Sequence, residues 1–273
     1  MIDGLSLEYA YARVCACLGD RPDDRLWQQL HSSRTVPALL ELVRGSPATD
    51  SVSGIPVGAS GDVIELAFRQ KLRSRIDEVA AWSPPEWRTA LQYTRHLADL
   101  PALMHLLTDE PSPAWVAADL ELGPYALDTL SERRAALTSG PFARLAEAAL
   151  EEPALAPMLA RLARGGAVAT LHRVLAAWSA QWRERWPAVS DEIAAGLLRV
   201  AQLLESHLRR FGALAVADAH AARQALSASM AALVRRHPAQ PAALFAYLAV
   251  FALDLERLRG EFVRRVYPVG AVT

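Results

Sequence analysis

The chain has 273 residues, of which 52% are hydrophobic, and its 29 basic and 30 acidic side chains leave a formal net charge of -1. This composition excludes intrinsic disorder, which requires low hydrophobicity and high net charge, and it gives no electrostatic reason to expect nucleic-acid binding. A chain of this length is expected to form one large or two modest domains with real cores.

Helical periodicity dominates the chain, and the clearest N-terminal example begins at Asp62. Asp62 and Glu65 have the spacing of a capping box, which predicts the start of a helix there. One apolar stripe follows, at Ile64, Phe68, Leu72, Ile76 and Val79, and the other face carries Arg69, Lys71 and Arg73. This pattern predicts a half-exposed amphipathic helix. Pro84 and Pro85 predict the start of the next helix, because proline is tolerated in a first helical turn.

Two stretches rich in turn-forming residues interrupt the helical pattern. Residues 46–61 are rich in Gly, Ser and Pro and predict a long loop. Residues 109–124 contain three prolines, with one short turn expected at Trp115 and Val116. We expect the subdomain boundary at this second stretch, which gives an N-terminal helical unit over residues 1–110 and C-terminal helical units over 111–273. The preceding helix is not expected to continue through Pro101.

A second amphipathic helix is expected after Ser190, and a buried helix is expected near the C-terminus. Apolar residues recur every three or four positions after Ser190, at Ile193, Leu197, Val200, Leu204, Leu208 and Phe211, before Gly212. The longest apolar run, residues 242–253, is 12 residues long. It is shorter than the roughly 18 to 20 residues that span a bilayer, so it predicts a core helix. No segment alternates with period two, and the predicted fold is an all-α multi-helix bundle.

Two helical segments share a short motif around an aspartate. Asp99 and Asp254 each follow an apolar or aromatic run, and leucines come one and four residues after each aspartate, at Leu100, Leu103, Leu255 and Leu258. The match indicates related helical units, although spacing alone does not establish a duplication.

Residue patterns typical of catalysis and metal binding are missing from the sequence. None of the seven histidines belongs to an HExxH pair or follows a glutamate by three positions. The glycines near residue 58 have no Lys-Ser/Thr after them, and no Gly-x-Ser-x-Gly elbow occurs. Cys15 and Cys17 point to different faces of one helix and are expected to stay unpaired. We therefore expect no catalytic residues, no metal and no cofactor.

Three tryptophans form the one suggestive binding feature. Trp178, Trp182 and Trp186 repeat every four residues and would form a stripe on a helix. Such a stripe is either core or a partner surface, because tryptophan is enriched in both. Core packing is the more frequent case, and the stripe is also the candidate partner interface of this chain.

The N-terminal stretch YAYARVCACLG, residues 9–19, resembles the opening of V-type ATPase subunit d and of its counterpart in archaeal and bacterial A/V-type ATP synthases. Residues 26–30, 36–43, 63–73 and 97–107 are similar to the segments that follow in this family. The C-terminal stretch 244–262 is similar to its last repeat, with Asp254, Leu258 and Arg259 at the motif positions. The chain departs from the family pattern at Ala102 and at Ala252-Leu253.

The resemblance implies three similar helical units arranged as a funnel, without catalytic residues. It implies a subunit that links the central stalk to the membrane c ring and supports coupling of ATP hydrolysis or synthesis to ion transport. The expected partners are central-stalk subunits and the c ring. Because no signal peptide follows Met1, we expect a cytoplasmic protein associated peripherally with the membrane through the complex. The alternative is a stand-alone helical adaptor or maturation chaperone that binds a protein partner through the tryptophan stripe.

Overall fold

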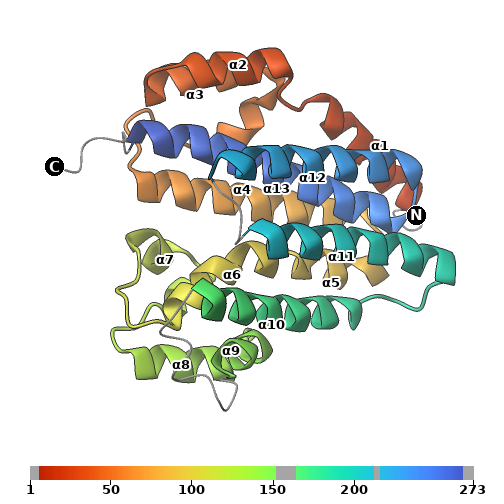
Figure 1. Ribbon diagram of the computed structural model, residues 1–273. Helices are drawn as coiled ribbons and strands as arrows, with labels where there is room; N and C mark the ends of the chain where they lie inside the picture. Colours follow the sequence, from red (N-terminus) through yellow and green to blue (C-terminus); the bar gives the residue numbers. More distant parts are fainter. Residues whose placement is uncertain (1–5, 152–163, 212–215, 267–273) are drawn as a thin grey trace. The chain divides into compact units, whose positions relative to one another are not determined.

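A computed structural model describes residues 6–151, 164–211 and 216–266 (Figure 1). Within these ranges the chain forms 13 α-helices, two short 3-10 helices and no strand. The predicted all-α multi-helix bundle is therefore confirmed. Among the described helices, none is both long enough and apolar enough to cross a membrane.

The chain divides into two compact units, and the division differs from the expected boundary at residues 110 and 111. Unit 1 combines Met1–Leu91 with Ser227–Thr273, and unit 2 consists of Gln92–Leu226. The reason is that the last helix, α13 (Pro241–Val266), packs against α4 (Gly61–Trp82) and α1 (Leu7–Gly19). A boundary based on chain order alone separates segments that share one core.

Unit 1 begins with four helices whose first turns are fixed by polar side chains. After α1 come α2 (Asp24–Ser32), α3 (Val36–Arg44), the 3-10 helix η1 (Pro47–Val52) and α4. The side chains of Ser6, Asp23, Thr35 and Ser60 each accept the backbone N–H three residues later. An N-cap of this kind satisfies one of the donors left unpaired at a helix start.

The predicted capping box at Asp62 is wrong. Ser60 is the N-cap of α4, and its hydroxyl accepts the N–H of Val63. Asp62 lies in the first turn, where a negative charge is favourable because of the helix dipole. The Glu65 carboxylate does not turn back to the helix start, since it is held by Arg69 and Arg259.

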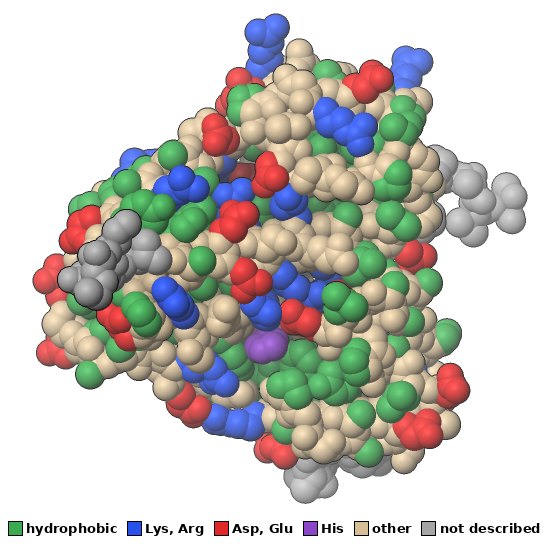
Figure 2. Space-filling view, turned by 180° about the vertical axis from the view of Figure 1, so that it is seen from behind, with side chains coloured by type: hydrophobic (Ala, Val, Ile, Leu, Met, Phe, Trp, Pro, Cys, Tyr) green, Lys and Arg blue, Asp and Glu red, His purple; other side chains and the backbone are tan. Residues whose placement is uncertain are grey.

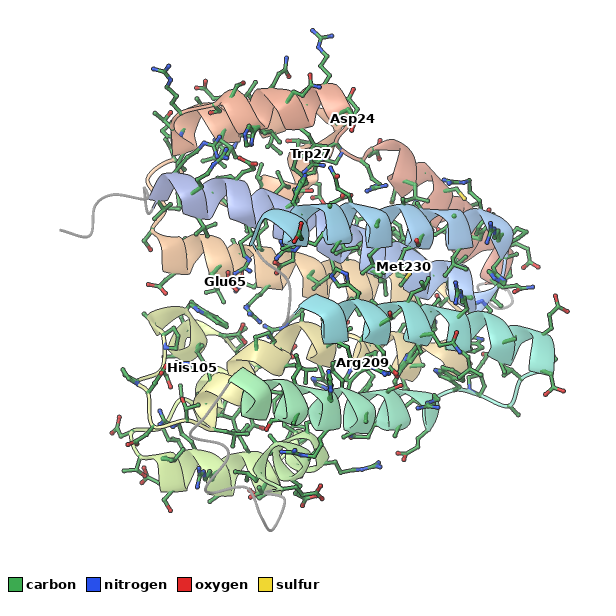
Figure 3. All side chains as sticks on the ribbon, in the orientation of Figure 1. Asp24, Trp27, Glu65, His105, Arg209 and Met230 are labelled. Atoms are coloured by element: carbon green, nitrogen blue, oxygen red, sulfur yellow. The ribbon has the colours of Figure 1, made fainter. Side chains whose placement is uncertain are left out.

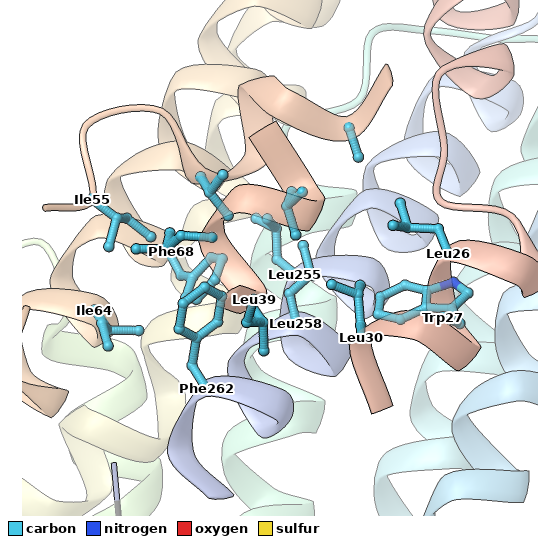
Figure 4. Close-up of a cluster of buried hydrophobic side chains, with 14 residues drawn as sticks. Leu26, Trp27, Leu30, Leu39, Ile55, Ile64, Phe68, Leu255, Leu258 and Phe262 are labelled. Atoms are coloured by element: carbon cyan, nitrogen blue, oxygen red, sulfur yellow. The ribbon is translucent and has the colours of Figure 1, made fainter. Parts of the chain in front are cut away.

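Four of the five residues of the predicted apolar stripe of α4 are buried and Leu72 is partly buried, and Ile64 and Phe68 belong to the core cluster of unit 1 (Figure 4). Ile64 and Phe68 face α13, where the ring of Phe262 meets the ring of Phe68 edge-on at a centroid distance of 5.6 Å. The cluster joins α2, α3, η1, α4 and α13 through Leu26, Trp27, Leu30, Leu39, Leu40, Val43, Ala48, Val52, Ile55, Ile64, Phe68, Leu255, Leu258 and Phe262. The N-terminal helices and the C-terminal helix thus bury one another's apolar faces.

The predicted core helix near the C-terminus is confirmed as the first half of α13. All residues from Ala242 to Leu248 are buried, which a helix with apolar residues on every side requires. Unit 1 also contains α5 (Pro85–Tyr93) up to Leu91, and α12 (Val216–Arg236) from Ser227. Trp87 of α5 lies edge-on to Phe245 of α13 at 6.3 Å.

Unit 2 contains the helices between these two segments. They are α6 (Arg95–Leu106), α7 (Ala114–Ala118), the 3-10 helix η2 (Gly123–Tyr125), α8 (Leu130–Ser139), α9 (Ala143–Leu150), α10 (Arg164–Arg183), α11 (Asp191–Phe211) and α12 up to Leu226. The short turn expected at Trp115 and Val116 is α7. The helix expected after Ser190 is α11, with Leu197 and Val200 buried, whereas Gly212 lies outside the described residues.

Helix α6 continues through Pro101, contrary to expectation. A proline in a helix interior removes one backbone hydrogen bond and crowds the preceding turn. Burial of Leu100, Leu103 and Leu106 on either side of it anchors both halves of the helix. Tertiary packing therefore outweighs the local preference against this helix.

Candidate functional site

The histidines and acidic residues of the described ranges form no group of three that could hold a metal ion. His96 and His105 both lie on α6, and nine residues apart they point to opposite sides of the helix. His96 packs edge-on against the rings of Tyr93 and Phe142. The His105 Nε2 atom lies 3.0 Å from the carbonyl oxygen of Pro111, so this side chain holds the loop after α6.

The predicted tryptophan stripe packs inside unit 2, but only Trp178 and Trp182 lie on α10, because this helix ends at Arg183 and Trp186 follows in the next turn. Trp178 and Trp182 are only 2% and 1% exposed, and Trp186 is half-buried. Trp178 stacks on Trp182 at a centroid distance of 5.5 Å and on Tyr93 at 6.1 Å. Trp178 and Trp182 thus pack as core residues, the more frequent of the two alternatives, because buried rings offer no surface to a partner, and the partner interface stays a prediction. Only the edge of the stripe, at Trp186, keeps partial access to solvent.

Arg185 packs on the ring of Tyr93, at one end of the stack of aromatic rings. The guanidinium carbon of Arg185 lies 3.9 Å from the centroid of the Tyr93 ring. Burial raises the pKa of the Tyr93 hydroxyl to about 12, although the charge of Arg185 acts in the opposite direction. The phenol is therefore neutral at every physiological pH, and the contact is a cation–π contact that supports packing.

The motif residues of α13 link this helix to other segments of unit 1. Arg21, which lies between α1 and α2, donates from Nε and Nη2 to the two carboxylate oxygens of Asp254, at 2.5 and 2.9 Å. Arg21 Nη2 also donates to the hydroxyl of Ser227 at 3.0 Å. A bidentate pair of this kind fixes both the position and the orientation of the guanidinium group. Asp254 thus anchors the connection between the first two helices to the last one.

Arg259 makes a second link, between α13 and α4. Its guanidinium group donates to Glu65 at 3.0 Å and to Glu256 at 3.0 Å. Glu65, which is labelled on α4 in Figure 3, also accepts a hydrogen bond from Arg69 at 2.8 Å. Leu258, one residue earlier, is fully buried in the core cluster. The three motif residues therefore hold helices of unit 1 in place.

The end of α13 holds the last turn of α2. Arg265 is 5% exposed and donates to the carbonyl oxygens of Leu30 and Ser33, while Arg264 donates to that of His31. The last carbonyl groups of a helix have no partner within the helix, so these arginines satisfy them. Glu261 accepts from Arg264 at 2.6 Å and from Arg265 at 2.9 Å, which joins the two arginines into one network.

Replacing Glu261 with glutamine is expected to remove a pH-dependent part of the stability. Burial of the Glu261 carboxylate raises its pKa, but the hydrogen bond from Arg265, the charge of Arg264 and the contact with His31 outweigh this effect and lower the pKa below 4.5. A lowered folded-state pKa contributes stability above the unfolded-state pKa, and this contribution disappears as the pH falls through the folded-state pKa. The free energy of unfolding of the wild type should therefore exceed that of E261Q by about 1 to 3 kcal/mol at neutral pH.

This difference is measured by urea unfolding at a series of pH values. It should stay constant between about pH 6 and pH 8 and shrink below about pH 4.5. A difference that does not change with pH would show that the Glu261 charge contributes nothing.

Replacing Asp254 with asparagine is expected to lower the stability of unit 1 by about 1.5 to 3 kcal/mol, because the Arg21 guanidinium group loses its carboxylate partner. The Asp254 side chain is 13% exposed and that of Arg21 is 30% exposed, so solvent replaces the pair only in part. Asp20, an exposed residue just after α1, offers a matched control. D20N should change the stability by no more than about 0.5 kcal/mol in the same urea titration. Equal effects of the two substitutions would exclude the anchoring role.

The two aspartate motifs share buried leucines, but their aspartates differ, since the Asp254 side chain is 13% exposed and pairs with Arg21. Asp99 is 1% exposed on α6, and the four motif leucines of α6 and α13 are all buried, at Leu100, Leu103, Leu255 and Leu258. The repeated spacing thus marks the helix face that each unit turns toward its core.

An open groove of about 880 Å³ lies along α2 and α3 in unit 1. Its lining includes Gln29 and Ser32 from α2 and Glu41 and Leu42 from α3, together with Arg25. The lining mixes polar and apolar side chains, and no local sequence pattern distinguishes a groove from an ordinary solvated surface. The face of the molecule in Figure 2 likewise carries basic and acidic side chains interspersed, without a patch of one sign.

Among the arginine–carboxylate pairs, Arg21–Asp254 and Arg259–Glu65 link different helical segments of unit 1, whereas Arg265–Glu261 lies within α13. In comparisons with known proteins, no family model matches the sequence and no curated protein matches it.

Proposed function

We propose that this protein is a non-catalytic subunit of a V-type rotary ATPase, which links the central stalk to the membrane c ring. In this role it supports the coupling of ATP hydrolysis or synthesis to ion transport. The proposal rests first on the resemblance of residues 9–19 and 244–262 to the first and last segments of the subunit d family. A linker between two rotating parts transmits torque through a rigid shape and needs no catalytic group.

The observation that carries the proposal furthest is the joint packing of these two terminal segments in unit 1. Residues 9–19 belong to α1 and residues 244–262 to α13, and the two helices are in contact. The motif residue Asp254 binds Arg21 just after α1, and Arg259 binds Glu65 of α4. The segments that resemble the family are thus the ones that depend on one another for their fold. This mutual dependence supports reading them as one inherited unit.

The all-helical architecture and the ion pairs between helices also agree with a mechanical role. Arginine–carboxylate pairs link α13 to the α1–α2 connection and to α4, and Arg265 links it to the end of α2. Paired charges with bidentate geometry resist sliding of one helix along another. A subunit that transmits torque requires such resistance.

Deletion of the gene tests the proposal directly. We expect loss of ATP-driven ion pumping in membrane vesicles, with ATP hydrolysis by the soluble head retained, because the link between them is lost. Complementation with the wild type and with V263A, which changes a partly exposed side chain on α13, should restore pumping. Unchanged pumping in the deletion strain would contradict the proposal.

Co-purification separates this proposal from the second candidate, a helical adaptor or maturation chaperone. The groove along α2 and α3 favours that candidate, since a binding protein needs a concave surface. Tagged full-length protein should capture components of the central stalk and of the c ring under the first proposal. Capture of a different protein in the absence of all rotary-ATPase components would instead support the adaptor.

A further inference from the structure

We draw no further inference here: the strongest candidate, the open groove of about 880 Å³ along α2 and α3 in unit 1, has a mixed lining of arginine, carboxylate, amide and apolar side chains, and nothing in the structure shows what covers it.

Discussion

Replacing Trp182 with alanine is expected to destabilise unit 2 by about 3 to 5 kcal/mol, the usual cost of removing a large aromatic side chain from a core. Trp182 is 1% exposed and lies between the rings of Trp178 and Trp186. The substitution removes both ring contacts and leaves a cavity that the surrounding helices fill only in part. Urea unfolding followed by far-UV circular dichroism measures the loss. Because a chain with two units can unfold in two steps, each transition is fitted separately.

The same substitution distinguishes core packing from partner binding. Trp186 is the half-buried member of the stripe, so W186A should cost clearly less stability than W182A. If the stripe were a partner surface, W182A would leave the unfolding curve unchanged and would reduce only the capture of a partner. An unchanged unfolding curve would therefore contradict the core assignment.

Replacing Phe262 with alanine is expected to destabilise unit 1 by about 3 to 5 kcal/mol. Phe262 has no exposed surface and lies edge-on to Phe68, and an aromatic pair adds about 0.5 to 1.5 kcal/mol to the effect of burial. The pair joins α13 to α4, two helices that are far apart in the chain. The neighbouring contact between the same two helices, Arg259 with Glu65, spans 194 positions. Loss of the ring therefore weakens the contact between the N-terminal and C-terminal parts of unit 1.

The neighbouring residue provides a matched control for this prediction. Val263 is 40% exposed on the same turn of α13, and V263A should change stability by no more than about 0.5 kcal/mol. The two variants place the same residue, alanine, in the same helix, so thermal and urea unfolding compare only the side chains that were removed. Similar losses in both would mean that Phe262 is not a core residue.

The candidate site was predictable from the sequence only in part. The spacing of Trp178, Trp182 and Trp186 indicated one helix face, but a buried and an exposed stripe have the same spacing. Whether this face is buried depends on which other segments pack against it, among them the segment that carries Tyr93. The groove along α2 and α3 gave no sequence signal, because a concave surface depends on how far apart two helices lie.

Capping and proline rules also failed where tertiary contacts competed with local preferences. Glu65 had the spacing to complete a capping box, but it binds Arg259, whose position in the chain gives no hint of this contact. Pro101 had the local properties of a helix end, but buried leucines on both sides keep α6 continuous. In both cases a contact distant in sequence outweighed a local preference of about 1 to 3 kcal/mol.

The sequence by itself determined that this protein is all-helical and where its main apolar faces lie. Periodicity of apolar residues is a local property, so the stripes of α4 and α11 and the buried run of α13 could be read directly. Only the tertiary structure decided that Ser227–Thr273 belongs with Met1–Leu91, and that Asp254 holds Arg21. The physical reason is that burial and ion pairing depend on which faces meet, and residues that are distant in the chain share no local pattern that could reveal it.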